Sequence, residues 1–320
     1  MGTSIVPSAE QMLTHRPEGP ERNPAAAYIL SLTSPASRRT MLQALNAVAR
    51  WLNPSSNAMS FRWAALRRTH MLGIRAHLAE RYAPASASKM LCAVRGTLRE
   101  AWRLGFIPEA DYRRAIDIQG IRGETLPRGR ALSPGEIAAL LGACGADPTP
   151  AGRRDGALIG VLFGTGIRRA EACGLDLEDF DAETGELRVR HAKGSKQRIV
   201  YASNGAGTWL EGWIQIRGQE PGPLFCAVKK GGRVELGRLS TQAIYSALQK
   251  RAAAAGIEHL SPHDLRRTNI TQLLEAGADA LIVSRLAGHA SVETTRLYDR
   301  RPESAKRSAA GMLHVPAPPA

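Results

Sequence analysis

Four segments in the second half of the chain carry residue types that could bind or transfer a phosphate group. The first, Gly164–Glu171 (GTGIRRAE), is a glycine turn that leads into a helix start carrying Arg168. The free N–H groups of a helix start and an arginine fork both favour an anion. Taken alone, the pattern is more typical of a surface turn with a solvated arginine pair, so a phosphate site is the alternative interpretation here.

The second and third segments are basic. Lys193–Arg198 (KGSKQR) places three cations on a predicted hairpin loop, which could reach a DNA groove or simply be solvated. Pro262–Thr268 (PHDLRRT) places His263 and Arg266 three residues apart on a predicted helix, so the two side chains share a face. A histidine and an arginine near a helix start make a phosphate site more credible, but a structural histidine is still the more common interpretation of this segment.

The fourth segment, residues 287–301, presents a histidine and a tyrosine among arginines. Gly288 ends a predicted helix and is followed by His289, and Tyr298 comes nine residues later. The alternative interpretation is a half-buried packing tyrosine whose hydroxyl is satisfied. Each of the four segments is therefore weak evidence when it is taken by itself.

The charge of the chain is compatible equally with a polyanionic partner and with a basic protein that is merely soluble. Its 320 residues include 43 Lys+Arg and 29 Asp+Glu, which gives a formal net charge of +14. Cations that contact phosphates release condensed counterions, which drives binding to nucleic acid. Residues 1–130 hold 19 Lys+Arg and 9 Asp+Glu, a net of +10, and the remainder holds +4. We therefore expect the first half to grip nucleic acid and the second half to carry the chemistry.

Composition excludes several other classes of protein. With 43% hydrophobic and 22% charged residues, the chain can bury a core and is not globally disordered. The longest apolar run, residues 156–164, is too short to span a bilayer, and the N-terminus does not resemble a signal peptide. The four cysteines are far apart and lack metal-ligand spacing. We expect a cytoplasmic protein without a metal, a cofactor or a membrane partner.

The segments lie in a predicted second domain. Residues 119–131 contain three Gly and three Arg with few apolar residues, which is typical of a linker. Ser133, followed by a proline and by Glu136, then predicts a capped helix start. The predicted organisation is a flexible tail (1–25), a helical domain (26–118), a linker (119–131), a mixed domain (132–312) and an irregular tail (313–320).

Hydrophobic periodicity predicts a mainly α fold with a small β-hairpin, an α+β class. The first domain is expected to be a bundle of four or five helices, including residues 38–52, 63–82 and 86–104. Arg95, Arg99 and Arg103 lie on one face of the last of these and are predicted DNA contacts. In the second domain, strands are expected at 186–191 and 197–201, and helices at 153–163, 168–173, 206–216, 241–255, 264–276 and 280–287.

Together and in this order, the four segments resemble the tyrosine recombinase (phage integrase) family, through nearly the whole of the second domain. Thr165–Leu175 is similar to the first arginine box of the family, and Lys193–Arg198 to its lysine hairpin. His263–Arg266, and Leu286–His289 followed by Tyr298, are similar to the second box. All six active-site positions carry the expected residue types. The first half matches the family's core-binding domain only in size and character.

The resemblance implies transfer of a DNA phosphodiester. Arg168 and Arg266 would bind the non-bridging oxygens and stabilise a five-coordinate transition state. Tyr298 would attack as the nucleophile and form a 3′-phosphotyrosyl link, which conserves the bond energy, so that rejoining needs no ATP. Lys193 would protonate the leaving 5′-oxygen, which departs as a 5′-hydroxyl.

Further residues complete the implied site. His263 would assist proton transfer at the tyrosine and His289 would hydrogen-bond the phosphate. Glu171 would orient the arginine-bearing turn without itself being catalytic. Among the flanking cations, for which a solvated surface is the equal alternative, the predicted DNA contacts are Lys196, Arg198 and Arg267.

The implied partner is double-stranded DNA with short inverted-repeat core sites, held in a clamp of the two domains. The family pattern implies a homotetramer in the synaptic complex, a monomer or dimer when free, and strand exchange through a Holliday junction that integrates, excises or resolves DNA. Accessory DNA-binding proteins are further implied partners, and residues 303–312 could pass to a neighbouring protomer. No arm-binding domain is expected, and the implied location is the bacterial cytoplasm at the nucleoid.

Two other functions compete with recombination. One is a catalytically silent, architectural DNA-binding protein, which the six intact positions argue against. The other is a relaxing enzyme similar to a type IB topoisomerase. The compact layout and the close spacing of His289 and Tyr298 favour the recombinase.

Overall fold

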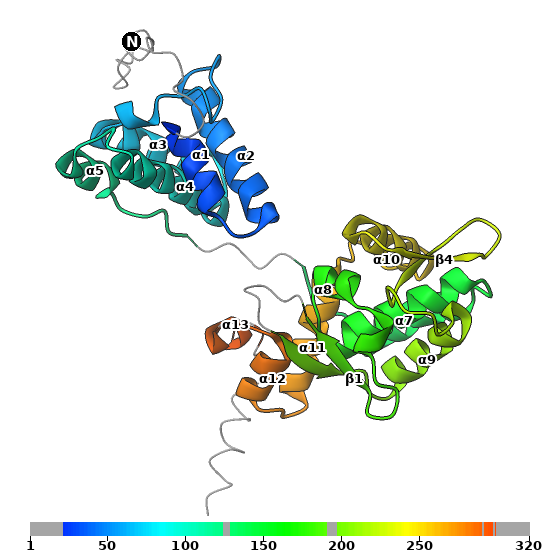
Figure 1. The fold of residues 1–320 in the computed structure, drawn as a ribbon. Helices are drawn as coiled ribbons and strands as arrows, with labels where there is room; N and C mark the ends of the chain where they lie inside the picture. The colour runs from blue at the N-terminus through cyan, green and yellow to red at the C-terminus, as the bar shows by residue number, and fades with distance from the viewer. Residues whose placement is uncertain (1–21, 124–128, 191–196, 290, 297, 299–320) are drawn as a thin grey trace, which may run out of the picture. The chain divides into compact units, whose positions relative to one another are not determined.

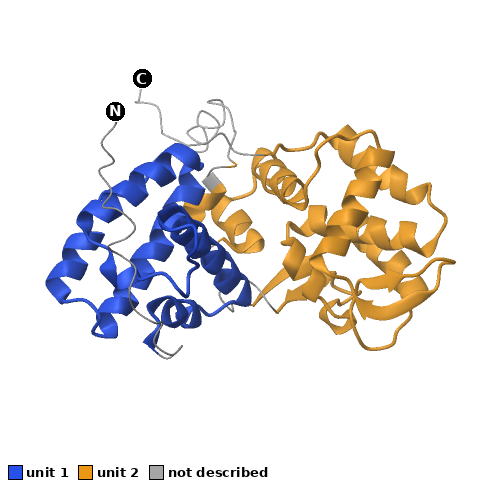
Figure 2. Ribbon diagram, turned by 90° about the horizontal axis from the view of Figure 1, so that it is seen from above, with its two compact units in different colours: residues 1–127 blue, residues 128–320 orange. Residues whose placement is uncertain are grey.

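The computed structural model describes residues 22–123, 129–190, 197–289, 291–296 and 298 (Figure 1). The chain divides into two compact units, residues 1–127 and 128–320 (Figure 2). The predicted linker, residues 119–131, contains this division. Among the described residues the elements of both units are mostly helices, with two small antiparallel sheets in the second, which confirms the predicted fold class. In the described part of the chain, no helix is both long and apolar enough to cross a bilayer.

Within the described residues of the first unit, all regular elements are helices or 3₁₀ turns, and α4 lies at their centre. Helix α4 packs against α1, α2, α3 and α5, and it buries residues on several sides, including Leu91, Val94 and Leu98. The tyrosine ring of Tyr28 on α1 approaches so closely that any side chain at Gly96 would overlap it. The bounds of the elements are α1 (Pro24–Ser31), α2 (Pro35–Leu52), the 3₁₀ turn η3 (Trp63–Ala65), α3 (Arg68–Arg81), α4 (Pro84–Arg103) and α5 (Glu109–Ile116).

The predicted continuous helix over residues 63–82 is wrong. The indole N–H of Trp63 donates to the carbonyl of Ala58 at 2.7 Å, and its ring is 1% exposed, so η3 is fixed in the core. The chain then re-enters a helix at α3, where Nδ1 of His70 accepts the backbone N–H of Arg67 at 3.0 Å. The amphipathic pattern spans both elements because both contribute to one core, so periodicity alone did not reveal the break.

The second unit is built around α7, whose residues 156–162 are all buried. Helix α7 packs against α6, α9 and α11. Its sequence favours this packing because it is an apolar run with glycines where neighbouring helices come close. The elements are α6 (Pro134–Gly145), α7 (Pro150–Thr165), α8 (Arg169–Gly174), η4 (Leu177–Asp179), β1 (Glu186–Val189), β2 (Arg198–Tyr201), α9 (Gly205–Arg217), β3 (Cys226–Val228), β4 (Val234–Arg238), α10 (Thr241–Ala254), α11 (Pro262–Glu275), α12 (Ala280–Ala287) and α13 (Val292–Arg296).

The predicted hairpin is present. Strands β1 and β2 are antiparallel, with Glu186 opposite Tyr201 and Val189 opposite Arg198, and β2 packs beside α12. The second hairpin, β3–β4, was not predicted, because β3 has only three residues and little alternation. The sequence signal for this hairpin was the glycine pair Gly231 and Gly232, which is typical of a tight turn. In the structure both glycines lie at the turn with positive φ.

Helix α11 is fixed at its start by the chain that enters the second unit. The Asp264 carboxylate accepts the backbone N–H of Ser261 at 2.8 Å and that of Arg130 at 3.1 Å. The hydroxyl of Thr268 accepts the N–H of Leu132 at 2.9 Å. Because His263 and Arg266 lie in the first two turns of α11, the anchoring contacts hold two of the predicted site residues.

Candidate active site

Arg168 is held by a buried carboxylate at the start of α8. Its backbone N–H donates to Oε2 of Glu171 at 2.8 Å, and its guanidinium donates to Oε1 at 2.9 Å. Glu171 is 3% exposed, and Arg198 donates to both of its oxygens. Burial raises the pKa of Glu171, but the hydrogen bonds from Arg198 and Arg168 outweigh it, so the net shift of this pKa is downward. The carboxylate therefore stays charged and fixes the arginine, as its predicted orienting role requires.

Arg266 lies on α11 with its guanidinium buried, at 2% exposure. It donates to the carbonyl of Gly166 at 2.6 Å. Gly166 has φ of +64°, and a Cβ there would meet the side chain of Asn269 at 2.4 Å, so glycine is required. Burial and the charge of Arg168 lower the pKa of Arg266 to about 10, which leaves it protonated at neutral pH. The repulsion between the two guanidiniums favours an anion between them.

Tyr298 lies among three cationic or titratable side chains. Its hydroxyl is 3.4 Å from Nε2 of His263. The ring of His289 stacks on the tyrosine ring with 6.0 Å between centroids, and the guanidinium of Arg267 lies 5.2 Å from the centroid. The tyrosine is 8% exposed and belongs to a small apolar cluster that includes Ile270. Packing therefore fixes the ring while its hydroxyl lies beside the imidazole of His263.

His289 follows the end of α12 and is turned toward the site by two contacts. Gly288 caps the helix with φ of +65°, and Nδ1 of His289 lies 2.7 Å from the hydroxyl of Thr295. Burial, together with the charges of Arg266, Arg168 and Arg198, lowers the pKa of the imidazole to about 4. The ring is therefore neutral at physiological pH, and Nε2 is its other hydrogen-bonding atom.

We expect His289 to titrate near pH 4 in the folded protein. The ordinary value is 6.5, so between these two pH values the unfolded chain binds a proton that the folded chain does not. The free energy of unfolding should therefore fall on acidification through this range, by up to about 1.4 kcal/mol per pH unit from this group.

Histidine labelled with ¹³C in the ring would report this titration directly. The resonance missing from the His289→Gln spectrum should titrate near pH 4, and His289→Gln should unfold with a shallower pH dependence between pH 4 and 6.5 than the unsubstituted chain. A midpoint above pH 6 for that resonance would contradict the assigned environment.

A hollow of about 300 Å³ joins α8, α10 and α11 at the predicted catalytic residues. Arg168, Arg266 and His263 line it, which places the two arginines and one histidine at one surface opening. Tyr245 also lines it and lies under the guanidinium of Arg169, 5.7 Å from the ring centroid. The structure thus brings five of the six predicted catalytic residues together. Three of them line the hollow, and Tyr298 and His289 join them because the tyrosine hydroxyl lies beside His263 and the tyrosine ring stacks on His289. The sixth, Lys193, lies outside the described residues.

The predicted DNA contacts differ in how accessible they are. Lys196 lies outside the described residues. Arg198 is partly buried against Glu171, with its side chain 11% exposed, and Arg267 is buried against the Tyr298 ring. These positions favour roles within the site over contacts with a DNA backbone.

The three arginines predicted as DNA contacts in the first unit also differ from one another. Arg95 is partly buried and donates to the carbonyl of Ile118, so it holds the chain that follows α5. Arg99 and Arg103 remain 47% and 56% exposed beside Glu100. The latter two keep the accessibility that a phosphate contact needs.

Two residues that matter to the site were not singled out from the sequence. Thr295 is fully buried and holds His289, and Asn269 donates to the carbonyl of Gly164 at 3.1 Å beside the Arg266 turn. Their only signal is position, one turn before Tyr298 and one turn after Arg266. Among the residues that the structure describes, no group of three or more His, Cys, Asp or Glu is placed to hold a metal ion.

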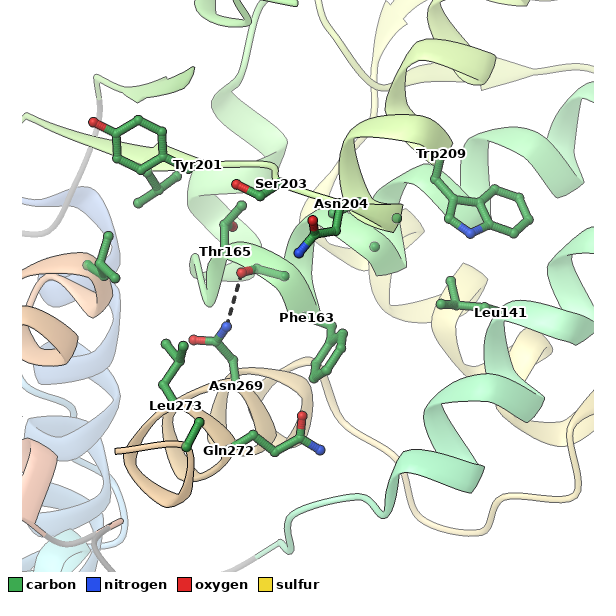
Figure 3. A pocket seen from close by; sticks show the side chains of 17 residues that line it. Leu141, Phe163, Thr165, Tyr201, Ser203, Asn204, Trp209, Asn269, Gln272 and Leu273 are labelled. Atoms are coloured by element: carbon green, nitrogen blue, oxygen red, sulfur yellow. Dashed lines mark hydrogen bonds between the residues drawn. The ribbon is translucent and has the colours of Figure 1, made fainter. Parts of the chain in front are cut away.

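A second, larger hollow is lined in part by Asn269. Figure 3 shows its aromatic and aliphatic side chains, with Phe163, Trp209 and Leu273 around it and the Asn269 hydrogen bond on its edge. Its volume is about 620 Å³. Because Asn269 and Thr165 line this hollow, its walls are continuous with the turn that holds Arg266.

Comparison with known proteins defines the class to which this fold and site belong. The model of the phage integrase family matches residues 130–304, which is more than half of the chain. The XerD tyrosine recombinase of Mycobacterium leprae is 38% identical over 224 residues, covering 67% of this chain and 68% of that protein. The XerC tyrosine recombinase of Corynebacterium efficiens is 36% identical over 172 residues, 53% of each. The chain thus spans about half the length of the corynebacterial relatives it matches.

Solved structures share the fold at low sequence identity. A lambda integrase (75–356) dimer bound to a COC′ core site matches with a TM-score of 0.66 and 15% identity, over 87% of this chain and 94% of that one. The XerH recombinase in a post-cleavage complex with palindromic difH matches with a TM-score of 0.63 and 21% identity, over 87% and 80%. The chain belongs to the phage integrase family of tyrosine recombinases, as its motifs predicted.

Proposed function

We propose that this protein is a site-specific DNA recombinase that cleaves and rejoins duplex DNA through Tyr298. One observation supports this most directly. The Tyr298 hydroxyl lies 3.4 Å from Nε2 of His263, and His263 lines one hollow with Arg168 and Arg266. A nucleophile, a base and two phosphate-binding forks are the parts that a metal-free phosphoryl transfer needs.

The roles of these residues follow from their contacts. The Tyr298 oxygen attacks the scissile phosphorus as its proton passes to the neutral imidazole of His263. Arg168 and Arg266 bind the non-bridging oxygens, and His289 donates a hydrogen bond from Nε2. The 5′-oxygen leaves with a proton from Lys193, and the 3′-phosphotyrosyl link remains. The reverse reaction with a 5′-hydroxyl of another strand completes the exchange.

The DNA and the assembly are part of the same proposal. Lambda integrase is known as a dimer on a core site and as a tetramer on a Holliday junction. By family likeness, this chain would act as a homotetramer on two duplexes that carry short inverted-repeat sites, with accessory DNA-binding proteins as further partners. The net charge of +10 in residues 1–130 would supply the salt-dependent part of the affinity.

The proposal is tested by covalent trapping. The target would first be found by enriching fragmented genomic DNA on the protein and sequencing it. A nicked duplex of that target, which loses a short fragment after cleavage, should then give an SDS-stable adduct on the 3′ side without ATP or divalent ions. Specific binding with no adduct would instead support the architectural alternative.

Lys193→Ala should slow cleavage of ordinary DNA, but it should leave the cleavage rate of one chemically modified substrate nearly unchanged. If Lys193 protonates the leaving oxygen, a 5′-bridging phosphorothiolate should be cleaved at nearly the unsubstituted chain's rate, because sulfur leaves without a proton. Cleavage rates on the two substrates would be compared for both proteins. Equal losses on both substrates would remove Lys193 as the general acid.

A further inference from the structure

Arg198, the first residue of β2, is committed to contacts inside the second unit. Its NH1 and NH2 groups donate to the two oxygens of Glu171 at 3.1 and 2.7 Å, a bidentate pair. Its side chain is 11% exposed and that of Glu171 is 2% exposed. A DNA phosphate could recruit this fork only by breaking a buried ion pair, which is costly.

The same two arginines that share Glu171 also hold the turn before His289. Nε of Arg198 donates to the carbonyl of Leu286 at 2.9 Å, and NH2 of Arg168 donates to the carbonyl of Gly288 at 3.0 Å. Together the contacts form a closed ring, which runs from Glu171 through each arginine to the last turn of α12. The residue that follows this turn is His289.

Gly288 shows how closely the Arg198 side chain approaches this turn. A Cβ at this position would lie 2.9 Å from the guanidinium carbon of Arg198, and φ is +65°. The guanidinium therefore lies against bare backbone, so its position and that of the turn depend on each other.

We propose that Arg198 is a positioning residue of the cleavage site, which fixes the Leu286–Gly288 turn, and with it His289, relative to Arg168. This inference rests on the proposed function. It replaces the sequence-based prediction that Arg198 contacts DNA. Arg198 also follows Lys193 by five residues in the chain, so it anchors the returning strand of the hairpin that carries the predicted general acid.

Single-turnover cleavage at saturating DNA separates positioning from DNA contact. Arg198→Gln should cleave at least about tenfold more slowly, because small misplacements of catalytic groups cost up to about 10²-fold. Its DNA affinity should stay within about threefold of the unsubstituted chain, with the same salt dependence. A weaker affinity with a salt slope reduced by about one, and an unchanged saturated rate, would overturn the inference in favour of a phosphate contact.

Arg188→Gln is the matched control. Arg188 is exposed on β1 and lies opposite Ile199, so the substitution removes the same charge from the same hairpin. It should leave the saturated cleavage rate unchanged. Arg198→Lys, which keeps the charge, guards against misfolding and should cleave faster than Arg198→Gln because it retains one of the donors. If Arg198→Lys is folded and cleaves at the unsubstituted rate, the bidentate fork has no positioning role.

A second measurement requires no DNA. The ring resonance of His289 should shift in Arg198→Gln, and its pKa should rise because a nearby cation is lost. Arg188→Gln should leave both unchanged. An unaltered His289 resonance in Arg198→Gln would overturn the inference even if the protein cleaves DNA. The unsubstituted chain could form no DNA adduct while the His289 resonance still shifts in Arg198→Gln. That result would contradict the proposed function but support the inference that Arg198 positions the turn before His289.

Discussion

Tyr298→Phe is expected to form no SDS-stable adduct on a nicked suicide substrate and to bind that DNA with unchanged affinity. Without the phenolic oxygen there is no atom to form the bond to phosphorus, so the loss should be complete within detection. The ring itself would remain stacked on His289 and under Arg267, so the packing that fixes residue 298 persists. The hydroxyl contributes one long hydrogen bond to His263, and its loss should cost about 1 kcal/mol or less in stability.

Two other tyrosines make this test specific. Tyr201→Phe removes a hydroxyl from a side chain that is 47% exposed on β2, and its adduct should form normally. Tyr245 is the rival nucleophile, because it lines the hollow that contains Arg168 and Arg266. An adduct that persists in Tyr298→Phe and disappears in Tyr245→Phe would reassign the nucleophile.

The helices of the second unit were predictable where local signals and packing agree. At Ser133 the capping box forms as expected, with the hydroxyl accepting the N–H of Glu136 at 3.2 Å. The one-turn spacing of His263 and Arg266 is likewise confirmed, because both lie near the start of α11. Such features depend on residues close in the chain, which pattern analysis can relate to one another.

The features that were missed depend on contacts between distant segments. Whether Arg198 points to solvent or to Glu171 is decided by a carboxylate 27 residues away in the chain and by the carbonyl of Leu286, 88 residues away. A basic loop sequence indicates only that cations are present. Arg95 shows the same limit, since its guanidinium is taken by a backbone carbonyl that carries no side-chain signal.

Arg266→Lys is expected to cleave DNA at least about 10²-fold more slowly than the unsubstituted chain, because removal of one preorganised donor to a developing negative charge costs about 10²–10³ in rate. The substitution keeps the positive charge, so a loss of rate would come from the changed number and geometry of the N–H donors. One donor of Arg266 already serves the carbonyl of Gly166 at 2.6 Å, and the planar fork leaves further N–H groups for a phosphate. A lysine ammonium in the same buried place cannot satisfy that carbonyl and two phosphate oxygens with the same geometry.

The rate should be measured in a single turnover with saturating DNA, after thermal unfolding has shown that the variant is folded. Arg285→Lys is the matched control. Arg285 is exposed on α12, so this substitution makes the same chemical change at a position outside the hollow. Its cleavage rate should be unaltered. If Arg266→Lys is folded and cleaves within about threefold of the unsubstituted chain, a bidentate fork at this position is not required, and Arg168 with a single cation at residue 266 would suffice to stabilise the transition state.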